Sequence, residues 1–369
     1  MVSLDDVATR AGVSKSTASR VLNNRGYLSQ KTIMKVQKAV QELNYQPNEL
    51  ARNLKKKRSG TIGLLVPDIE YPFYSKLISH IESELYNRDI KLMLCNSSRN
   101  NSKELQRLQA FQRNKVDGLI LCDYGLEPSS YQGLNFPVVC IDRYVQKGMS
   151  YVASDHRMGG TLAANCLIEN GCREVIHIAY ETKVEAPWAE RHIAFSKILK
   201  ERGVICHTVE MDTYRSYENF EKNCNSLADL LKKYPYTDGF FGSDLWAVVA
   251  VKTALKLGYK IPKDFKIIGY DGTILSEITT PSITTICQPI DKIAFWAVDT
   301  ICKLLEDDPV QSCEVRMRVE LDVYKRQLVL LSQLQLQRTQ IRELNRFQCI
   351  SLLLLQQVQK HRSSFYPLS

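Results

Sequence analysis

Residues 3–23 read SLDDVATRAGVSKSTASRVLN, and this stretch decides how the N-terminal part of the chain folds. Ser3 can cap a helix, and apolar residues then recur at helical spacing up to Gly12, a residue that readily adopts the left-handed conformation at a helix end. Ser14 can cap a second helix over residues 15–23. Because the turn between the two helices is so short, the pattern predicts a helix-turn-helix.

The second helix presents polar side chains on the side that faces away from the apolar core. Donors near a helix N-terminus suit base edges and phosphates, although each of these residues could also be an ordinary surface residue. The outward residues are Lys15, Ser16, Thr17, Ser19 and Arg20. A third helix is predicted from Ser29 to about Asn44, and its apolar stripe closes a minimal three-helix core.

The segment that follows, residues 47–58, has too few apolar residues to form a core of its own. Pro47 ends the preceding helix, and Asn48 can cap a short new one. Since an isolated helix of fewer than about 12 residues rarely forms in water, we expect this segment to fold only against a partner or DNA.

The net charge of +9 is distributed unevenly along the chain. Lys and Arg exceed Asp and Glu by 8 in residues 1–60 and by 6 in residues 323–369, whereas residues 61–322 carry a net charge of −5. A basic N-terminal module ahead of a mildly acidic body favours binding to a polyanion, with nucleic acid as the first candidate. A solvated basic surface would give the same pattern.

From Thr61 onward, short apolar strands alternate with amphipathic helices, which predicts an α/β body of two parallel-sheet halves. The predicted strands are residues 61–66, 90–95, 117–122, 137–142, 175–180, 204–211, 239–243 and 265–271. The predicted helices are residues 73–88, 103–115, 188–202, 217–233 and 245–257. Strands buried on both faces are near-continuous apolar runs, as these are.

Polar residues directly after these strands are candidates for ligand binding, because ligands of open α/β sheets bind at the carboxyl ends of the strands. These residues are Asp68, Asp142, Arg143, Ser243, Asp244 and Asp271. Carboxylates and a guanidinium offer paired hydrogen bonds to a polyhydroxylated ligand, and nearby aromatic faces can stack on it, so a sugar is the first hypothesis. Asp244 and Asp271 could instead cap the helices that follow them.

Three stretches resemble one known family: DVATRAGVSKSTASRVLN (6–23), KVQKAVQELNYQPN (35–48) and ARNLKKKRSGTIGLLVPDI (51–69). They resemble the LacI/GalR family of bacterial repressors. The resemblance implies that the second helix enters the major groove of operator DNA. It also implies that the hinge helices of a dimer meet in the minor groove, where a leucine wedges between base pairs. The implied DNA-binding residues are Lys15, Ser16, Thr17, Ser19, Arg20, Asn23, Asn48, Ala51 and the wedge Leu54.

The body resembles the periplasmic-binding-protein-like effector domain of the same family as far as about Asp322. The implied effector-binding residues are Asp68, Phe73, Asp142, Arg143, Arg191, Tyr214, Asp244, Asp271 and Gln288. Within the family, GYLSQKTI (26–33), IGYDGT (268–273) and SITTICQPI (282–290) are most similar to sucrose-operon repressors. The expected effector is therefore a sucrose- or fructose-like sugar, whose binding changes the dimer interface and disorders the hinge helices.

We expect four regions: a helix-turn-helix domain over 1–46, a hinge over 47–60, an effector-binding and dimerisation domain over 61–322, and an atypical extension over 323–369. Residues 327–369 contain nine Gln and eleven Leu but no Gly, Ala or Asp, which marks a segment of different origin. A non-native extension is favoured over an oligomerisation helix, because the heptad pattern lapses at Gln348.

Enzyme classes find little support in the sequence. It contains no Walker loop, no G-x-G-x-x-G motif, no nucleophile elbow and no zinc-spaced pair among its six histidines, so we expect no catalytic residue, metal or cofactor. Without a secretory signal or a long apolar run, a cytoplasmic location is expected. The expected partners are a palindromic double-stranded operator, a sugar and a second copy of the chain, with a tetramer also possible. A cytoplasmic sugar-binding protein without DNA regulation, or a regulator with a non-sugar or protein co-effector, remains an alternative.

Overall fold

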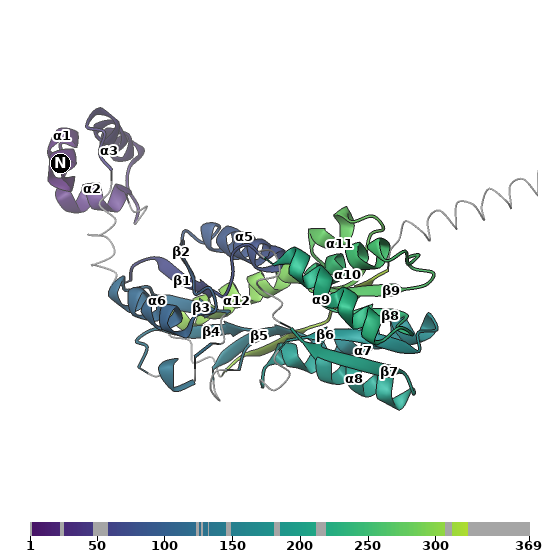
Figure 1. Cartoon of the computed structure of the whole chain (residues 1–369). Coiled ribbons are helices and arrows are strands. Elements are labelled where there is room, and N and C mark those ends of the chain that lie inside the picture. Colours follow the sequence, from purple (N-terminus) through teal and green to yellow (C-terminus); the bar gives the residue numbers. More distant parts are fainter. Residues whose placement is uncertain are drawn as a thin grey trace, which may run out of the picture.

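The computed structural model describes residues 2–22, 26–46, 58–122, 125–126, 128–131, 133–144, 149–180, 185–211, 219–306 and 312–323. Within these ranges the chain forms an N-terminal unit of three helices and a larger α/β body (Figure 1). Of the predicted hinge, only residues from Arg58 onward are described. The predicted site residues Asn23, Asn48, Ala51, Leu54 and Tyr214, and the extension after Val323, lie outside the described residues.

The N-terminal unit consists of α1 (Leu4–Ala11), α2 (Lys15–Leu22) and α3 (Gln30–Glu42). Ser3 caps α1, because its hydroxyl accepts a hydrogen bond from the Asp6 backbone N–H at 3.3 Å while the Asp6 carboxylate accepts one from the Ser3 N–H at 2.8 Å. Gly12 ends this helix with a φ of 63°. The Thr17 N–H donates to the Ser14 hydroxyl at 3.1 Å, so α2 begins with the predicted cap.

Apolar residues from all three helices form the core of this unit. The buried members are Val7, Ala8, Ala11, Ala18, Val21, Val36 and Ala39. Val13, in the turn between α1 and α2, packs against them, and its N–H donates to the Ala8 carbonyl at 3.0 Å. The predicted three-helix fold thus has its own small core, which fixes the outward face of α2.

The described part of the body contains two six-stranded sheets. The strands of the first sheet are, in spatial order, β11 (Glu314–Met317), β5 (Ser150–Ser154), β4 (Val138–Ile141), β3 (Gly118–Leu121), β1 (Thr61–Val66) and β2 (Lys91–Asn96). Those of the second are β12 (Glu320–Asp322), β10 (Thr284–Cys287), β9 (Lys266–Asp271), β8 (Gly239–Phe241), β6 (Glu174–Ala179) and β7 (Ile205–Glu210). All described pairings are parallel except that of β10 with β12.

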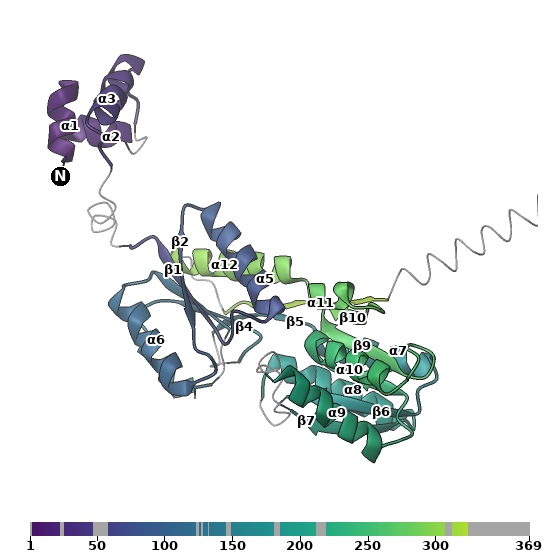
Figure 2. The ribbon, with the colours of Figure 1, turned by 45° about the horizontal axis from the view of Figure 1, so that its top comes forward.

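Helices cover both faces of each sheet (Figure 2). On the first sheet, α5 (Pro72–Tyr86) and α12 (Ile290–Leu305) pack on one face and α6 (Asn101–Arg113) on the other. On the second sheet, α9 (Phe220–Lys233) and α10 (Asp244–Lys256) pack on one face, and α7 (His156–Glu169) and α8 (Glu190–Glu201) on the other. The short helix α11 (Ile274–Ile278) follows β9.

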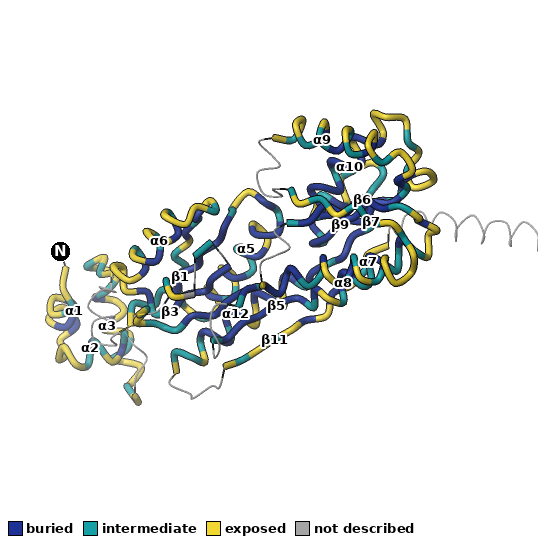
Figure 3. The backbone as a smooth tube through the Cα atoms, turned by 60° about the horizontal axis from the view of Figure 1, so that its bottom comes forward, coloured by how far each residue is buried: buried dark blue, intermediate teal, exposed yellow. Residues whose placement is uncertain are grey.

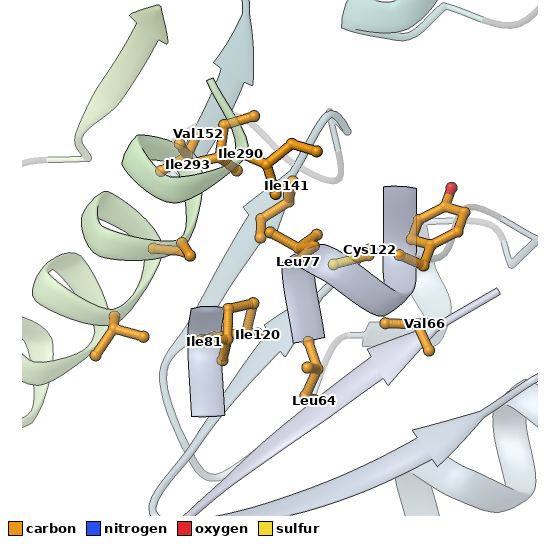
Figure 4. Close-up of a cluster of buried hydrophobic side chains, with 14 of the residues drawn as sticks. Leu64, Val66, Leu77, Ile81, Ile120, Cys122, Ile141, Val152, Ile290 and Ile293 are labelled. Atoms are coloured by element: carbon orange, nitrogen blue, oxygen red, sulfur yellow. The ribbon is translucent and has the colours of Figure 1, made fainter. Parts of the chain in front are cut away.

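The core of the first half lies between its sheet and the pair α5 and α12. Leu77 and Ile81 of α5 and Ile290 and Ile293 of α12 belong to one buried cluster, together with strand residues such as Ile120 beside Ile81 (Figure 4). The central strands β3 and β4 are buried along their whole length, and β1 is buried in all but its first residue (Figure 3), which explains why they appear in the sequence as apolar runs.

The chain crosses between the two halves three times: from β5 to α7, from β10 to α12, and from β11 to β12. The sequence predicted two halves in succession and missed these crossings. Residues 290–317 return to the first half, because α12 packs against β3, β4 and β5 and because β11 pairs with β5. Three segments of the chain therefore connect the two halves.

Candidate functional site

A cavity lies between the two halves, at the carboxyl ends of their strands. Its lining consists of Tyr71, Phe73, Tyr74, Cys122, Ile141, Asp142, Trp188, Arg191, Ser243, Asp271 and Gln288. Five of these are predicted effector-binding residues: Phe73, Asp142, Arg191, Asp271 and Gln288. The structure thus brings together residues that are up to 215 positions apart in the sequence and that come from both halves.

Two of the lining carboxylates occupy equivalent positions in the two halves. Asp142 directly follows β4 in the first half, and Asp271 ends β9 in the second. Both residues have positive φ angles, 52° for Asp142 and 120° for Asp271. Such conformations are rare outside glycine and concentrate at functional sites, because the surrounding fold must offset their cost.

The Asp142 carboxylate is held by groups of the segment that leads into the second half. The His156 ring lies with Nε2 2.9 Å from the Asp142 carboxylate and Nδ1 2.8 Å from the Tyr270 hydroxyl. The Ser154 backbone N–H also donates to this carboxylate, at 3.3 Å. Asp142 is therefore fixed by the crossover segment between β5 and α7.

Asp271 already receives a hydrogen bond on each of its carboxylate oxygens. Gln288 donates its amide N–H to one oxygen at 2.8 Å, and the Tyr71 hydroxyl, from the other half, donates to the second. Gln288 in turn accepts a hydrogen bond from the Ser154 hydroxyl at 2.8 Å. Burial raises the pKa of Asp271, and the charge of Arg191 opposes that rise.

Arg191 supplies the positive charge of the cavity. Its guanidinium lies 4.4 Å from the centre of the Tyr270 ring, a cation–π arrangement that fixes its position. Trp188 lies one helical turn before it, in the short 3₁₀ helix Pro187–Ala189 that leads into α8. Together with Tyr71, Phe73 and Tyr74, this tryptophan gives the cavity aromatic walls.

Asp244 does not line the cavity, although the sequence predicted it as an effector-binding residue. Its side chain is fully buried and accepts hydrogen bonds from the Thr273 N–H at 2.6 Å, the Thr273 hydroxyl at 2.8 Å and the Thr285 hydroxyl at 2.6 Å. Burial and the neighbouring charge of Asp271 raise the pKa of Asp244 to about 7. Its contacts hold the loop after Asp271 against β10.

Arg143 and Asp68 also lie outside the lining of the cavity. The Arg143 guanidinium is buried, donates to the Tyr131 hydroxyl at 2.8 Å and to the Leu126 carbonyl at 2.6 Å, and lies 3.7 Å from the Glu104 carboxylate. The Asp68 carboxylate accepts hydrogen bonds from the backbone N–H groups two and three residues later, at 2.7 and 3.4 Å. Arg143 is therefore held by the loop and helix residues of its own half, and Asp68 by its own turn.

Sequence reasoning missed five residues of the lining: Tyr71, Tyr74, Cys122, Ile141 and Trp188, whereas Ser243 was among the polar residues that follow a predicted strand. A signal existed for some of them. Tyr71 and Tyr74 flank the predicted Phe73 in the aromatic stretch YPFY, and Trp188 precedes Arg191 by three residues, the spacing of one helical face. Cys122 and Ile141 are apolar residues at the ends of predicted strands, so nothing in the sequence marked them as lining residues. Among the described residues, no group of His, Cys, Asp and Glu is arranged to hold a metal ion.

The predicted DNA-binding surface is the outward face of α2. Lys15, Ser16 and Arg20 are exposed there, whereas Thr17 and Ser19 are half-buried. Lys15 forms an exposed ion pair with Asp5 of α1 at 2.7 Å, a contact that contributes little to stability and that a phosphate could replace. The face is therefore basic and open. None of the helices in the described residues is both long and apolar enough to cross a membrane.

Comparison with known proteins agrees with this architecture. The model of the lacI family of bacterial regulatory proteins matches residues 3–48, and a periplasmic binding protein-like domain matches residues 138–327. The chain is 38% identical over 304 residues to a sucrose operon repressor of Streptococcus mutans, an alignment that covers 82% of this chain and 92% of that protein. This chain belongs to the LacI family.

Further LacI-family likenesses agree with the assignment. A ribose operon repressor of Halalkalibacterium halodurans is 36% identical over 324 residues, covering 88% of this chain and 96% of that one. A periplasmic binding protein/LacI transcriptional regulator from Alkaliphilus metalliredigens, solved with D-xylulofuranose, is 29% identical, covers 72% of this chain and 97% of its own, and has a TM-score of 0.65. The predictions of a LacI-type fold and of a DNA-binding transcriptional repressor are thereby confirmed.

Proposed function

We propose that this protein is a repressor whose binding to operator DNA is controlled by a small sugar held in the cavity between its two halves. The observation that carries this proposal is the composition of the cavity: two carboxylates, a guanidinium and an amide surrounded by four aromatic rings. Hydroxyl-rich ligands need paired donors and acceptors, and the C–H faces of sugars stack on aromatic rings. A purely apolar ligand would leave Asp142 and Asp271 without new partners.

The sugar we favour is sucrose or a fructose-like furanose. Two observations support this choice: the relatives include a sucrose operon repressor, and the solved relative from Alkaliphilus metalliredigens binds a ketose in its furanose form. A ribose operon repressor of similar identity makes ribose the competing candidate. The discriminating contacts would come from Arg191, which stacks on Tyr270, and from Gln288, whose side-chain oxygen accepts a hydrogen bond from Ser154.

For the DNA-binding unit we propose that Arg20 and Lys15 contact base edges or phosphates, with Ser16, Thr17 and Ser19 in supporting contacts. The exposure of Arg20 on α2 supports this role. Asn23, Asn48, Ala51 and the wedge Leu54 remain predictions, because they lie outside the described residues.

We further propose that two copies of the chain bind a palindromic operator. Exposed apolar residues on the second half support an assembly, because Ile274 and Ile278 of α11 are 55% and 67% exposed and Leu255 and Leu257 lie open at the end of α10. A protein that regulates bacterial genes through an operator would act in the cytoplasm and would not need catalytic residues.

The domain boundaries that fit this function are a helix-turn-helix domain over 1–46, a hinge over 47–60 and an effector domain over 61–322, with 323–369 as an extension of different origin. Removing residues 327–369 tests the last assignment. We expect the truncated chain to bind DNA like the full chain, and loss of dimerisation would instead make the extension an assembly element.

The decisive experiment is selection of a palindromic DNA site in vitro, followed by binding measurements with sucrose, fructose, ribose and their phosphates. We expect a single sugar to change the affinity for the selected site. Binding that no sugar affects would contradict the sugar effector, and the failure to select any site would contradict the repressor.

A further inference from the structure

The chain enters the body at residues 58–60, the last three residues of the predicted hinge, and the body holds these residues by several hydrogen bonds. The Asp117 carboxylate accepts hydrogen bonds from the backbone N–H groups of Ser59 and Gly60, at 2.6 and 2.7 Å, and from the Ser59 hydroxyl at 3.1 Å. One step earlier, Arg58 donates to the carbonyl of Leu305, the last residue of α12. We call residues 47–60, which connect the N-terminal unit to the body, the DNA-binding arm. Two separate elements of the first half therefore hold the last three residues of this arm.

These two elements are themselves packed together. Gly118, the first residue of β3, lies against Ile301 in the last turns of α12, and a Cβ at this glycine would come within 2.9 Å of the Ile301 side chain. The neighbouring Asp117 N–H donates to the Thr61 carbonyl of β1 at 2.8 Å. The start of β1, the start of β3 and the end of α12 thus form one cluster around residues 58–60.

The opposite end of α12 begins at the cavity. Gln288, which lines the cavity and donates to Asp271, lies two residues before the helix, and its carbonyl accepts from the Ile290 N–H at 2.9 Å. The helix has 16 residues and a continuous buried face on the first sheet. At a rise of about 1.5 Å per residue, it spans about 24 Å from the cavity to the anchored arm.

The second half contains the same hydrogen-bond arrangement without an arm attached to it. Asp238, directly before β8, accepts from the N–H groups of Arg173 and Glu174 at 3.0 to 3.2 Å, and its own N–H donates to the Glu174 carbonyl at 2.9 Å. There the carboxylate only ties the turn before β6 to its own sheet. A comparison of variants of Asp117 and Asp238 therefore distinguishes the structural role of such a carboxylate from an effect on the DNA-binding arm.

We propose that Asp117 is a positioning residue: with the C-terminal end of α12, it anchors the DNA-binding arm and transmits the state of the cavity to it. This inference rests on the proposed function for the identity of the signal. A ligand that contacts Gln288 in the cavity changes the constraint on the N-terminal end of α12. Because α12 is a packed helix, a shift of its N-terminal end is carried to its C-terminal end. The contacts that hold residues 58–60 then change as well.

The test compares Asp117→Asn with Asp238→Asn in the full-length protein. Asparagine keeps one acceptor but replaces the other with a donor, so each variant loses part of one carboxylate grip. Three quantities are measured: the affinity for the selected DNA site without and with each sugar of the screen, the affinity for the sugar without DNA, and the rate at which trypsin cleaves after Arg58.

We expect Asp117→Asn to reduce the effect of the sugar on operator affinity by about 10-fold, within the usual range of coupling between sites, while sugar affinity stays within about 2-fold. Trypsin cleavage after Arg58 should accelerate. In Asp238→Asn, the sugar effect and the cleavage rate should match those of the unmodified chain. Should Asp117→Asn fail to fold, Arg58→Gln, which removes the contact with Leu305 and with it the trypsin site, carries the expectation for the sugar effect alone.

An unchanged sugar effect and cleavage rate in a folded Asp117→Asn protein would overturn the anchor, as would equal losses in Asp238→Asn. The failure of the proposed function looks different, because the unmodified chain would then respond to no sugar. In that case the cleavage rates of the Asp117→Asn and Asp238→Asn variants alone test whether Asp117 anchors residues 58–60.

Discussion

Tyr71 and Asp271 come from opposite halves of the body and meet across the cavity, where the Tyr71 hydroxyl donates a hydrogen bond to the Asp271 carboxylate. Since Gln288 already occupies the other oxygen, both oxygens of the most buried carboxylate in the lining are engaged before any ligand arrives. A sugar hydroxyl that binds Asp271 must share or replace one of these donors. We expect the tyrosine to be the one replaced, because it comes from the other half, whereas the backbone N–H of Gln288 also donates to the Asp271 carbonyl at 3.3 Å.

Replacing Tyr71 with phenylalanine should therefore strengthen sugar binding. The variant removes a competing donor that contributes about 1 kcal/mol, so we expect an affinity gain of about 5-fold in calorimetry. Tyr74→Phe removes a hydroxyl from the same wall without touching Asp271 and should leave the affinity within about 2-fold. Weaker binding by Tyr71→Phe would mean that the tyrosine hydroxyl contacts the sugar itself.

Exchanging Asp271 for asparagine should weaken sugar binding, because the carboxylate offers only acceptors and the amide offers one fewer. Hydrogen bonds to charged groups contribute about 1.5 to 3 kcal/mol, which predicts a loss of about 10- to 100-fold. The matched control is Asp68→Asn, a second predicted carboxylate, which lies outside the lining and accepts hydrogen bonds from its own turn. Equal losses in the two variants would instead mean that Asp68 also contacts the sugar.

The difference between Asp68 and Asp271 shows what the sequence can predict about such a site. Strand periodicity locates the carboxyl ends of β4 and β9, and hence Asp142 and Asp271, because each strand is a local pattern. The orientation of Asp244 and Arg143 depends on partners such as Thr285 and Glu104, which lie 41 and 39 positions away and become neighbours only in the folded protein.

The same reasoning explains what was missed in the fold. The N-terminal unit follows from local caps and apolar spacing, and its three helices begin and end within two residues of the prediction. The return of α12 to the first half has no local signature. Its apolar face would suit either sheet, and only the match with Leu77 and Ile81 of α5 selects the first one.

Asp244 should make the stability of the effector domain depend on pH. Its pKa is raised from 3.8 to about 7 in the folded protein, so the folded state binds a proton that the unfolded state has already released above pH 4. The contribution of Asp244 to the free energy of unfolding should therefore be largest below about pH 4. This contribution should be lost as the pH rises to about 7.

The measurement is denaturant unfolding of the unmodified chain and of Asp244→Asn at several pH values. Asparagine retains an acceptor for the Thr273 N–H and does not ionise. The difference between the two proteins should change by a few kcal/mol between pH 4 and 7, since one pKa unit corresponds to ~1.4 kcal/mol, and should be constant above about pH 8. The difference reports the interacting pair Asp244 and Asp271, because the charge of Asp271 is one of the causes that raise the pKa of Asp244. A difference that does not vary with pH would show that Asp244 is ionised throughout.

Arg20 should read the operator from the exposed face of α2. Replacing it with alanine removes a donor fork suited to a guanine edge, and we expect a loss of ~1 to 3 kcal/mol at the selected site together with relaxed discrimination at one base position. Arg10→Ala removes the same charge from the last turn of α1, where Arg10 is paired with Glu42 at 2.7 Å, and should cost less at every sequence. Binding to a library of single-base variants separates the two effects. If Arg20→Ala weakens all sequences equally, the arginine contacts only phosphates, and base reading must come from Lys15 or Ser16.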